Sequence, residues 1–282
     1  MDFNSPEVAA FIIKSLQEDI GDGDHSSLAS IPEDAVGQAK LLFKEDGVLA
    51  GIQLASVILK HLDRQVKIEF FKRDGDKIYN GDIGLLATGN TRALLAGERL
   101  LLNCMQRLSG IATITRKLVE EIDGTGARIL DTRKTTPGLR FLEKWAVTMG
   151  GGFNHRHGLY DMIMLKDNHV DHAGGIEAAL NRTREYLSNN NLHLKVEIET
   201  RNLEEVAKVL EVGGADRIMF DNFEPDEMRK AVKLVDGKLE TEASGGIHLG
   251  NIRAYAETGV DFISVGALTH SVKSLDISFK QV

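Results

Sequence analysis

The sequence predicts an α/β protein with two domains, the first built on an antiparallel sheet and the second on an incomplete or irregular α/β barrel. Residues 36–90 hold short strand-like runs separated by turn signals such as Asp46-Gly47 and Asp74-Gly75. From residue 128 onward, apolar strands alternate with helices, and the last four strands begin at residues 194, 217, 239 and 261. Repeated βα units of this kind form a parallel sheet with helices outside it.

The barrel is predicted to be incomplete because the second domain is short. Six strands can be counted after residue 128, whereas a full barrel has eight strands and takes about 250 residues. A doubly wound sheet is the alternative. However, no G-x-G-x-x-G or P-loop motif follows the first strand, so a Rossmann or P-loop sheet has little support.

The elements of the first domain follow from local signals. Ser5 and Pro6 predict the start of a helix, whose apolar residues then recur at helical spacing. We interpret the next segment, EDIGDGDHSS, as a turn, and a metal site formed by Asp22, Asp24 and His25 is the less favoured alternative. The predicted strands are Gln38–Phe43, Val66–Phe71 and Leu85–Thr88, and a helix is predicted over Gln53–Leu62.

One long helix is predicted from Thr91 to Glu121, with Gly110 as a candidate break. Leucine, isoleucine and methionine form an apolar stripe along it. Spacing alone places Arg99, Asn103 and Gln106 on a second face that is exposed to solvent.

The composition argues against several classes of protein. The chain of 282 residues has a net charge of −8 and a pI near 5.6, which disfavours general DNA or RNA binding. No apolar run approaches the roughly 18 residues of a membrane span, and the N-terminus has no signal-peptide pattern. The single cysteine, Cys104, lies in an apolar helical run. We therefore expect a structural buried thiol and a reducing, cytoplasmic location.

Polar and glycine residues follow every predicted strand of the second domain. The carboxyl ends of parallel strands meet at one edge, where ligands bind in such folds. A structural salt bridge across the barrel mouth could account for any one of these charged residues. It accounts less well for polar or glycine residues at all six strand ends. The six strands are Arg128–Asp131, Met162–Leu165, Leu194–Glu199, Arg217–Phe220, Leu239–Ala243 and Asp261–Val265.

Cations are concentrated in the segment Asp131–Val170. It holds six Lys and Arg residues and four Asp and Glu residues, so its net charge is +2, whereas the net charge of the whole chain is −8. Such a local excess suggests a site for a small, highly charged anion and not for a nucleic acid. Arg133 and Arg156 can hold a carboxylate in a bidentate way, whereas Lys134 and Lys166 suit phosphate groups as point charges.

Carboxylates and glycines on the later strands suit a second ligand. Glu199 and Asp221 can hold ribose hydroxyls or Mg²⁺. The glycines after the fifth and sixth strands leave backbone N–H groups open to a phosphate, although tight turns need glycine as well. A Schiff-base role for Lys166 is the weaker alternative, because its polar surroundings oppose the desolvation that such a lysine needs.

At these residues the sequence resembles the quinolinate phosphoribosyltransferases, also called carboxylating nicotinate-nucleotide pyrophosphorylases. The resemblance covers essentially the whole chain, with one extra residue at Gly213-Gly214 in a helix–strand loop. The segments that match in order are EDIGDGDHSS, ERLLLNCMQRLSGIAT, DTRKTTPGLR, GGGFNHRHGLYDMIMLKDNH, KVEIE, FDNF, EASGGI and ISVGALTH.

The resemblance implies an N-terminal α/β sandwich domain over residues 1–110, joined by the tail 271–282, and a C-terminal open α/β barrel over residues 111–270. The barrel would be TIM-like with fewer than eight regular strands. A homodimer or a hexamer is implied, in which each barrel mouth is covered by the partner's N-terminal domain. The implied pentosyltransferase reaction joins quinolinate to phosphoribosyl pyrophosphate with Mg²⁺. It yields nicotinate mononucleotide, pyrophosphate and carbon dioxide for NAD biosynthesis.

The resemblance also implies roles for individual residues. Arg99 would reach the site from another subunit, which replaces its assignment to a solvated face. Lys134, Lys166, Glu199 and Asp221 would be catalytic, and the two carboxylates would also hold the metal, partly through the substrate. The implied substrate-binding set is Arg99, Thr132, Arg133, Lys134, His155, Arg156, Lys166, Glu199, Asp221, Ser244, Gly245, Gly246, Val265, Gly266 and Ala267.

Two other functions are weaker alternatives. A relative of the molybdenum-transport protein ModD would share the fold but act on a different substrate. The complete NHR, GLYD and KDNH motifs argue against it. A catalytically silent homologue would only bind an anion, and the full set of charged site residues argues against that.

Overall fold

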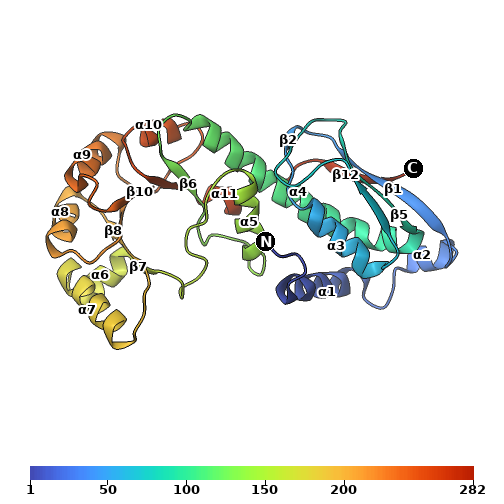
Figure 1. Ribbon diagram of the computed structural model, residues 1–282, viewed down its shortest axis with the longest axis horizontal. Helices are drawn as coiled ribbons and strands as arrows, with labels where there is room; N and C mark the ends of the chain where they lie inside the picture. The colour runs from blue at the N-terminus through green and yellow to red at the C-terminus, as the bar shows by residue number, and fades with distance from the viewer. The chain divides into compact units, whose positions relative to one another are not determined.

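The computed structural model describes all 282 residues, which form two compact units (Figure 1). The first unit comprises Met1–Ile114, Phe141–Gly151 and Val272–Val282, and the second comprises Thr115–Arg140 and Gly152–Ser271. The C-terminal tail, expected to join the N-terminal domain, lies in the first unit. Phe141–Gly151, which we expected in the barrel domain, lies there too.

The first unit contains a four-stranded antiparallel sheet. Its order is β12 (Ile277–Gln281), β1 (Val36–Phe43), β5 (Ile83–Asn90) and β3 (Lys67–Phe70), which confirms the three strands predicted in the first domain. Leu41 of β1 lies opposite Phe279 and Leu85, and all three side chains are buried on one face. A separate ribbon pairs β2 (Gly47–Val48) with β4 (Lys77–Ile78).

Helix starts in the first unit follow the capping signals of the sequence. The helix α1 (Pro6–Ile20) begins after Ser5, whose hydroxyl accepts a hydrogen bond from the N–H of Val8. Asp24 caps α2 (His25–Ser30) in the same way by accepting from the N–H of Ser27 at 3.1 Å. The Asp24 carboxylate therefore has a structural role, and the end of the segment interpreted as a turn is the first turn of a helix.

The helix α4 (Thr91–Glu121) is continuous, so the candidate break at Gly110 is wrong. A side chain at Gly110 would collide with the backbone carbonyl of Lys273, and close packing of the C-terminal tail explains this glycine. Gln106 is not solvated either, because its side-chain N–H donates to the carbonyl of Ile277 at 2.8 Å. Burial raises the pKa of the Cys104 thiol to about 12, consistent with a structural role.

Two further helices pack in the first unit. Gly97 of α4 lies against Leu59 of α3 (Ile52–Leu62), since a Cβ added there would come within 3.2 Å of that leucine. The helix α5 (Arg140–Met149) packs on the N-terminal segment through two edge-to-face ring pairs. Trp145 lies 5.1 Å from Phe3 and Phe141 lies 6.1 Å from Phe11, measured between ring centres. These contacts explain why this segment belongs to the first unit.

The second unit is an open parallel barrel of six strands, the number predicted. Its order is β6 (Arg128–Leu130), β11 (Phe262–Ser264), β10 (Glu240–Ser244), β9 (Arg217–Asp221), β8 (Val196–Thr200) and β7 (Ile163–Leu165). β6 and β7 do not pair, so the sheet does not close. Figure 1 shows the helices on the outside of the strands, namely α6 (Asp167–Ala173), α7 (Ile176–Asn189), α8 (Leu203–Val212), α9 (Pro225–Val235) and α10 (Ile252–Ala256).

A short helix, α11 (Ala267–His270), completes the second unit directly after β11. Because all six strands are parallel, their carboxyl ends and the following loops share one edge. No helix in the protein is both long enough and apolar enough to cross a membrane.

Candidate active site

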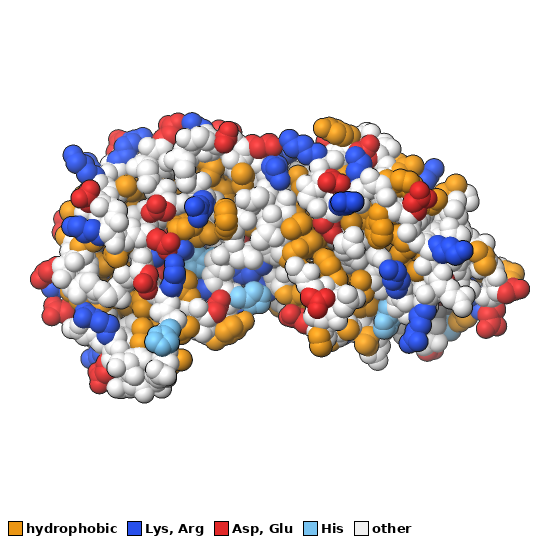
Figure 2. All heavy atoms as spheres, in the orientation of Figure 1, with side chains coloured by type: hydrophobic (Ala, Val, Ile, Leu, Met, Phe, Trp, Pro, Cys, Tyr) orange, Lys and Arg blue, Asp and Glu red, His pale blue; other side chains and the backbone are white.

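A cavity of about 690 Å³ lies at the carboxyl ends of the barrel strands, and only residues of the second unit line it. Charged side chains of both signs are interspersed over the face seen in Figure 2, so this face has no continuous basic surface for a polymer. The cavity brings together most of the residues singled out in the sequence. These are Thr132, Arg133, Lys134, His155, Arg156, Lys166, Glu199, Asp221, Ser244, Gly245, Gly246, Gly266 and Ala267.

Two predicted residues lie elsewhere. The side chain of Val265 is buried in the core, only 2% exposed, and its N–H donates to the carbonyl of Leu130. Arg99 is exposed on α4 of the first unit and does not line the cavity.

Two guanidinium groups converge in the cavity without a carboxylate partner. The Nε atom of Arg133 is buried and has no hydrogen-bond acceptor. Arg156 donates only to the carbonyl of Met162, at 3.3 Å. Burial and the positive charge of Arg133 lower the pKa of Arg156, so the two cations repel each other. An anion bound between the two groups would relieve this repulsion, and the sequence analysis expected an anion site at these residues.

The lysine Lys166 is half-exposed and already paired. Its Nζ lies 3.2 Å from Oε2 of Glu199, and its backbone N–H donates to Nδ1 of His169. A Schiff-base lysine needs a desolvated amine, so the exposure of Lys166 and its contact with Glu199 disfavour the Schiff-base alternative. Burial raises the pKa of Glu199, while Lys166 lowers it and repulsion from Asp221 raises it further.

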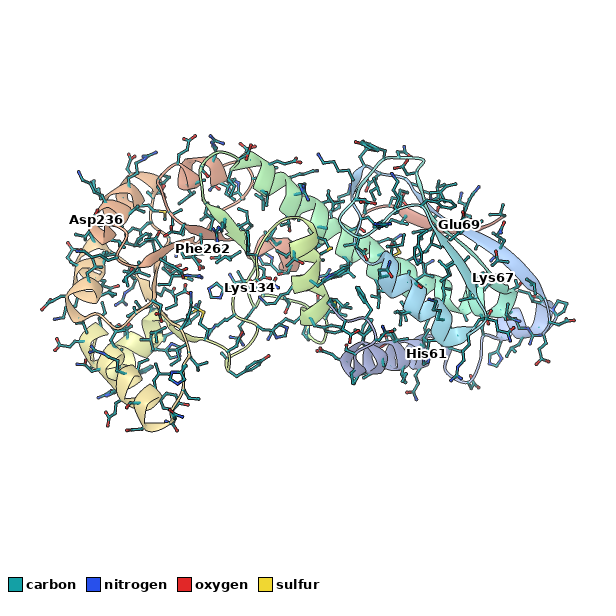
Figure 3. All side chains as sticks on the ribbon, viewed as in Figure 1. His61, Lys67, Glu69, Lys134, Asp236 and Phe262 are labelled. Atoms are coloured by element: carbon teal, nitrogen blue, oxygen red, sulfur yellow. The ribbon has the colours of Figure 1, made fainter.

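Lys134 links the cationic loop to the glycine loop after β11. It lies in the loop that follows β6 (Figure 3), and its carbonyl accepts a hydrogen bond from the hydroxyl of Thr269 at 2.8 Å. A Cβ on Gly266 would come within 3.0 Å of the Lys134 side chain. A glycine at this position lets the lysine lie directly over the loop.

The sequence analysis missed a buried charge network in the wall of the cavity. Nε2 of His155 lies 3.0 Å from Glu197 and 3.3 Å from Glu242, both of which have fully buried side chains. Nη1 of Arg217 lies 3.0 Å from Glu242, and its guanidinium stacks 4.1 Å from the ring centre of Phe262 (Figure 3). Strand periodicity could have revealed this network, because Glu197 and Glu199 are two residues apart and face the same side.

Two observations bear on the charge of His155. Its Nδ1 lies 2.6 Å from the N–H of Arg156, which favours an unprotonated Nδ1. A neutral ring, however, would leave Arg217 alone to balance the buried Glu197 and Glu242. Burial lowers the pKa of His155, but the two carboxylates raise it to about 9. Burial and the neighbouring Glu242 also raise the pKa of Glu197, so both shifts favour a proton held within this cluster.

The carboxylates Glu199 and Asp221 fit a divalent cation. They lie at the ends of the neighbouring strands β8 and β9, and their mutual repulsion contributes to the raised pKa of Glu199. Their oxygen atoms are the hard ligands that Mg²⁺ prefers. His155, Glu197 and Glu242 also bring three ligand atoms within 4.8 Å. That group does not fit a metal, because His155 and Arg217 already contact its two carboxylates and Arg217 brings a positive charge into the cluster.

Comparison with known proteins gives consistent matches for both parts of the chain. The family model for the N-terminal domain of quinolinate phosphoribosyl transferase matches residues 24–109, and that for the C-terminal domain matches residues 111–280. The chain is 46% identical over 289 residues to the chloroplastic carboxylating nicotinate-nucleotide pyrophosphorylase of Arabidopsis thaliana, covering 97% of this chain and 82% of the relative.

A bacterial relative and a solved structure agree with these matches. The probable carboxylating nicotinate-nucleotide pyrophosphorylase of Bacillus subtilis (strain 168) is 48% identical over 261 residues, with 93% of this chain and 89% of the relative covered. The crystal structure of NadC from Streptococcus pyogenes superposes with a TM-score of 0.94 at 36% identity, covering 99% and 98% of the two chains. The matches extend over both units of the fold.

Proposed function

Because the chain belongs to the quinolinate phosphoribosyltransferase family, we propose that it transfers the phosphoribosyl group of phosphoribosyl pyrophosphate to quinolinate. The transfer is accompanied by decarboxylation and yields nicotinate mononucleotide, pyrophosphate and carbon dioxide, a step of NAD biosynthesis. The single observation that carries this proposal is the pair of guanidinium groups of Arg133 and Arg156 in the cavity wall, which repel each other and leave the Nε of Arg133 without an acceptor. Quinolinate supplies two adjacent carboxylates.

Quinolinate binds in the cationic half of the cavity. Arg133 and Arg156 each accommodate a carboxylate through paired N–H donors, and His155 lines the same cavity. Fixing both carboxylates sets the angle of the pyridine ring and directs its nitrogen toward the sugar. This orientation lowers the entropic cost of bringing two substrates together.

Phosphoribosyl pyrophosphate binds in the half of the cavity that is lined by carboxylates and glycines. Glu199 and Asp221 accept hydrogen bonds from the ribose hydroxyls, and backbone N–H groups at Gly245, Gly246 and Gly266 face the 5′-phosphate. Lys134 and Lys166 lie where the pyrophosphate emerges from the sugar. Mg²⁺ held by Glu199, Asp221 and substrate oxygens would neutralise negative charge on the pyrophosphate.

The reaction needs no protein nucleophile. As the bond between C1 of the ribose and the pyrophosphate breaks, positive charge grows on the sugar near Glu199 and Asp221. Negative charge grows on the leaving group, where the two lysines stabilise it. The ring nitrogen then forms the new bond to C1 and becomes cationic. That cation accepts the electron pair released when the adjacent carboxylate leaves as carbon dioxide, and the ring carbon takes up a proton.

The assembly and the location are parts of the same proposal. We infer a homodimer, or a hexamer built from dimers, in which Arg99 of one copy completes the cavity of another. The exposed position of Arg99 on α4 supports this arrangement. We also infer a cytoplasmic location from the lone, buried thiol of Cys104, although plant relatives are named as chloroplastic or mitochondrial.

Calorimetric titration distinguishes this transferase from a ModD-like relative and from a silent anion-binding homologue. Quinolinate is expected to bind at least about tenfold more tightly than nicotinate, because nicotinate lacks the carboxylate that satisfies one of the two guanidinium groups. A ModD-like relative would show no such preference. Equal affinity for the two acids would contradict the assignment of Arg133 and Arg156 to a dicarboxylate.

A further inference from the structure

The backbone of Asn222 has an unusual conformation at the edge of the cavity. Asn222 follows β9 directly, and its φ angle is 56°. Only Asn191 and Asp236 share a positive φ among residues other than glycine, and neither of them lines the cavity. Asparagine tolerates this conformation better than most residues, but the conformation still costs free energy. Such a backbone conformation persists only where surrounding contacts hold it in place, and it is often found at functional sites.

The contacts of Asn222 connect two strand ends. The side-chain N–H of Asn222 donates to Oδ2 of Asp221 at 2.8 Å. Its backbone N–H donates to the carbonyl of Ser244 at 2.9 Å. A Cβ on Gly245 would overlap the Asn222 amide oxygen, so the amide is packed directly against the glycine loop. One residue therefore contacts the carboxylate after β9 and the loop after β10.

These contacts have a consequence for the carboxylate of Asp221. Oδ2 is engaged by the Asn222 amide, and the rotation of the carboxylate is restricted. Asp221 lines the cavity, and its Oδ1 is not engaged by this contact. A glycine in place of Asn222 would keep the positive φ but would free both the carboxylate and the loop.

We propose that Asn222 is a positioning residue that sets the Asp221 carboxylate at a fixed place relative to the Gly245–Gly246 loop. This inference rests on the proposed function, in which Asp221 contacts the ribose and metal and the loop contacts the 5′-phosphate of one substrate. Asn222 thereby holds the Asp221 carboxylate and the Gly245–Gly246 loop at the separation that bound phosphoribosyl pyrophosphate requires. Quinolinate binds to the opposite wall and does not depend on Asn222.

The test is calorimetric titration of Asn222→Gly with phosphoribosyl pyrophosphate in the presence of Mg²⁺, and separately with quinolinate. The affinity for phosphoribosyl pyrophosphate is expected to fall about tenfold or more, since a hydrogen bond to a charged group is lost. The affinity for quinolinate is expected to stay within about twofold. Aspartate at position 222 tolerates the same backbone conformation, but it lacks the N–H donor and places a second negative charge beside Asp221. The Asn222→Asp variant should therefore lose at least as much affinity for phosphoribosyl pyrophosphate as Asn222→Gly.

Asn191→Gly is the matched control, because Asn191 has nearly the same φ, 50°, in an exposed loop outside the cavity. It should bind both ligands like the wild type, and melting temperatures should show that all variants fold. Wild-type affinity of Asn222→Gly for phosphoribosyl pyrophosphate, or an equal loss for both ligands, would overturn the positioning role. If the wild type binds quinolinate but not phosphoribosyl pyrophosphate, the proposed function fails, and the inference fails with it.

Discussion

Replacement of Arg156 by lysine is expected to lower kcat/KM for quinolinate about 30- to 1000-fold, equivalent to about 2–4 kcal/mol of transition-state stabilisation. Lysine keeps the charge but cannot form two parallel hydrogen bonds with a carboxylate. Arg156 also lies beside Arg133, whose Nε has no acceptor within the protein. The loss should therefore arise from poor orientation of the pyridine ring and not from a change in net charge. Steady-state kinetics with quinolinate as the varied substrate measures this loss of kcat/KM.

Arg182→Lys is a suitable control for this substitution. Arg182 also donates to a single backbone carbonyl, that of Ala173, but it lies on the exposed surface of α7. Its replacement should change kcat/KM by less than about twofold. If Arg156→Lys retains kcat/KM within about threefold of the wild type, Arg156 does not clamp a carboxylate in the transition state.

Mixing the Arg99→Ala and Lys166→Ala variants is expected to restore about a quarter of the wild-type activity, although each variant alone should be inactive. Random exchange of subunits makes about half of the dimers mixed. Each mixed dimer has one intact cavity, which combines Lys166 of one copy with Arg99 of the other. The measurement is the initial rate of product formation after mixing in equal amounts.

A second mixture serves as the control for the recovery of activity. Lys166→Ala and Asp221→Asn both alter residues that line the same cavity of one chain, so this mixture should stay inactive. Subunit exchange can be verified with tagged copies. No recovery by the Arg99→Ala and Lys166→Ala pair, with exchange confirmed, would rule out a cavity shared between subunits.

Much of the candidate site could be predicted because parallel strands impose a simple rule. The chain leaves each strand at the same edge, so Lys166, Glu199 and Asp221 had to lie near one another once the six strands were assigned. The same rule placed the glycines after β10 and β11 at the cavity. The helix start after Ser5 was also predicted, because a capping hydroxyl acts within three residues, whereas the helix that begins after Asp24 was interpreted as a turn.

The remaining features depend on contacts between distant parts of the chain. Gly110 suggested a helix break, but in fact it makes room for the carbonyl of Lys273 far along the sequence. The packing of Trp145 on Phe3 has no local signal either. Glu197 and Glu242 looked like ordinary strand residues, and only the fold shows that both approach His155. The resemblance to the family implied which residues surround the substrates, but it did not imply the contacts of Glu197 and Glu242 with His155.

The most direct test of the central claim is an assay of the purified protein with quinolinate, phosphoribosyl pyrophosphate and Mg²⁺. The quinolinate should carry an isotopic label in the carboxylate next to the ring nitrogen. We expect nicotinate mononucleotide, pyrophosphate and labelled carbon dioxide to form in equal amounts, and no mononucleotide to form when nicotinate replaces quinolinate. A fully folded protein that releases no labelled carbon dioxide, or that uses nicotinate as readily as quinolinate, would contradict the account.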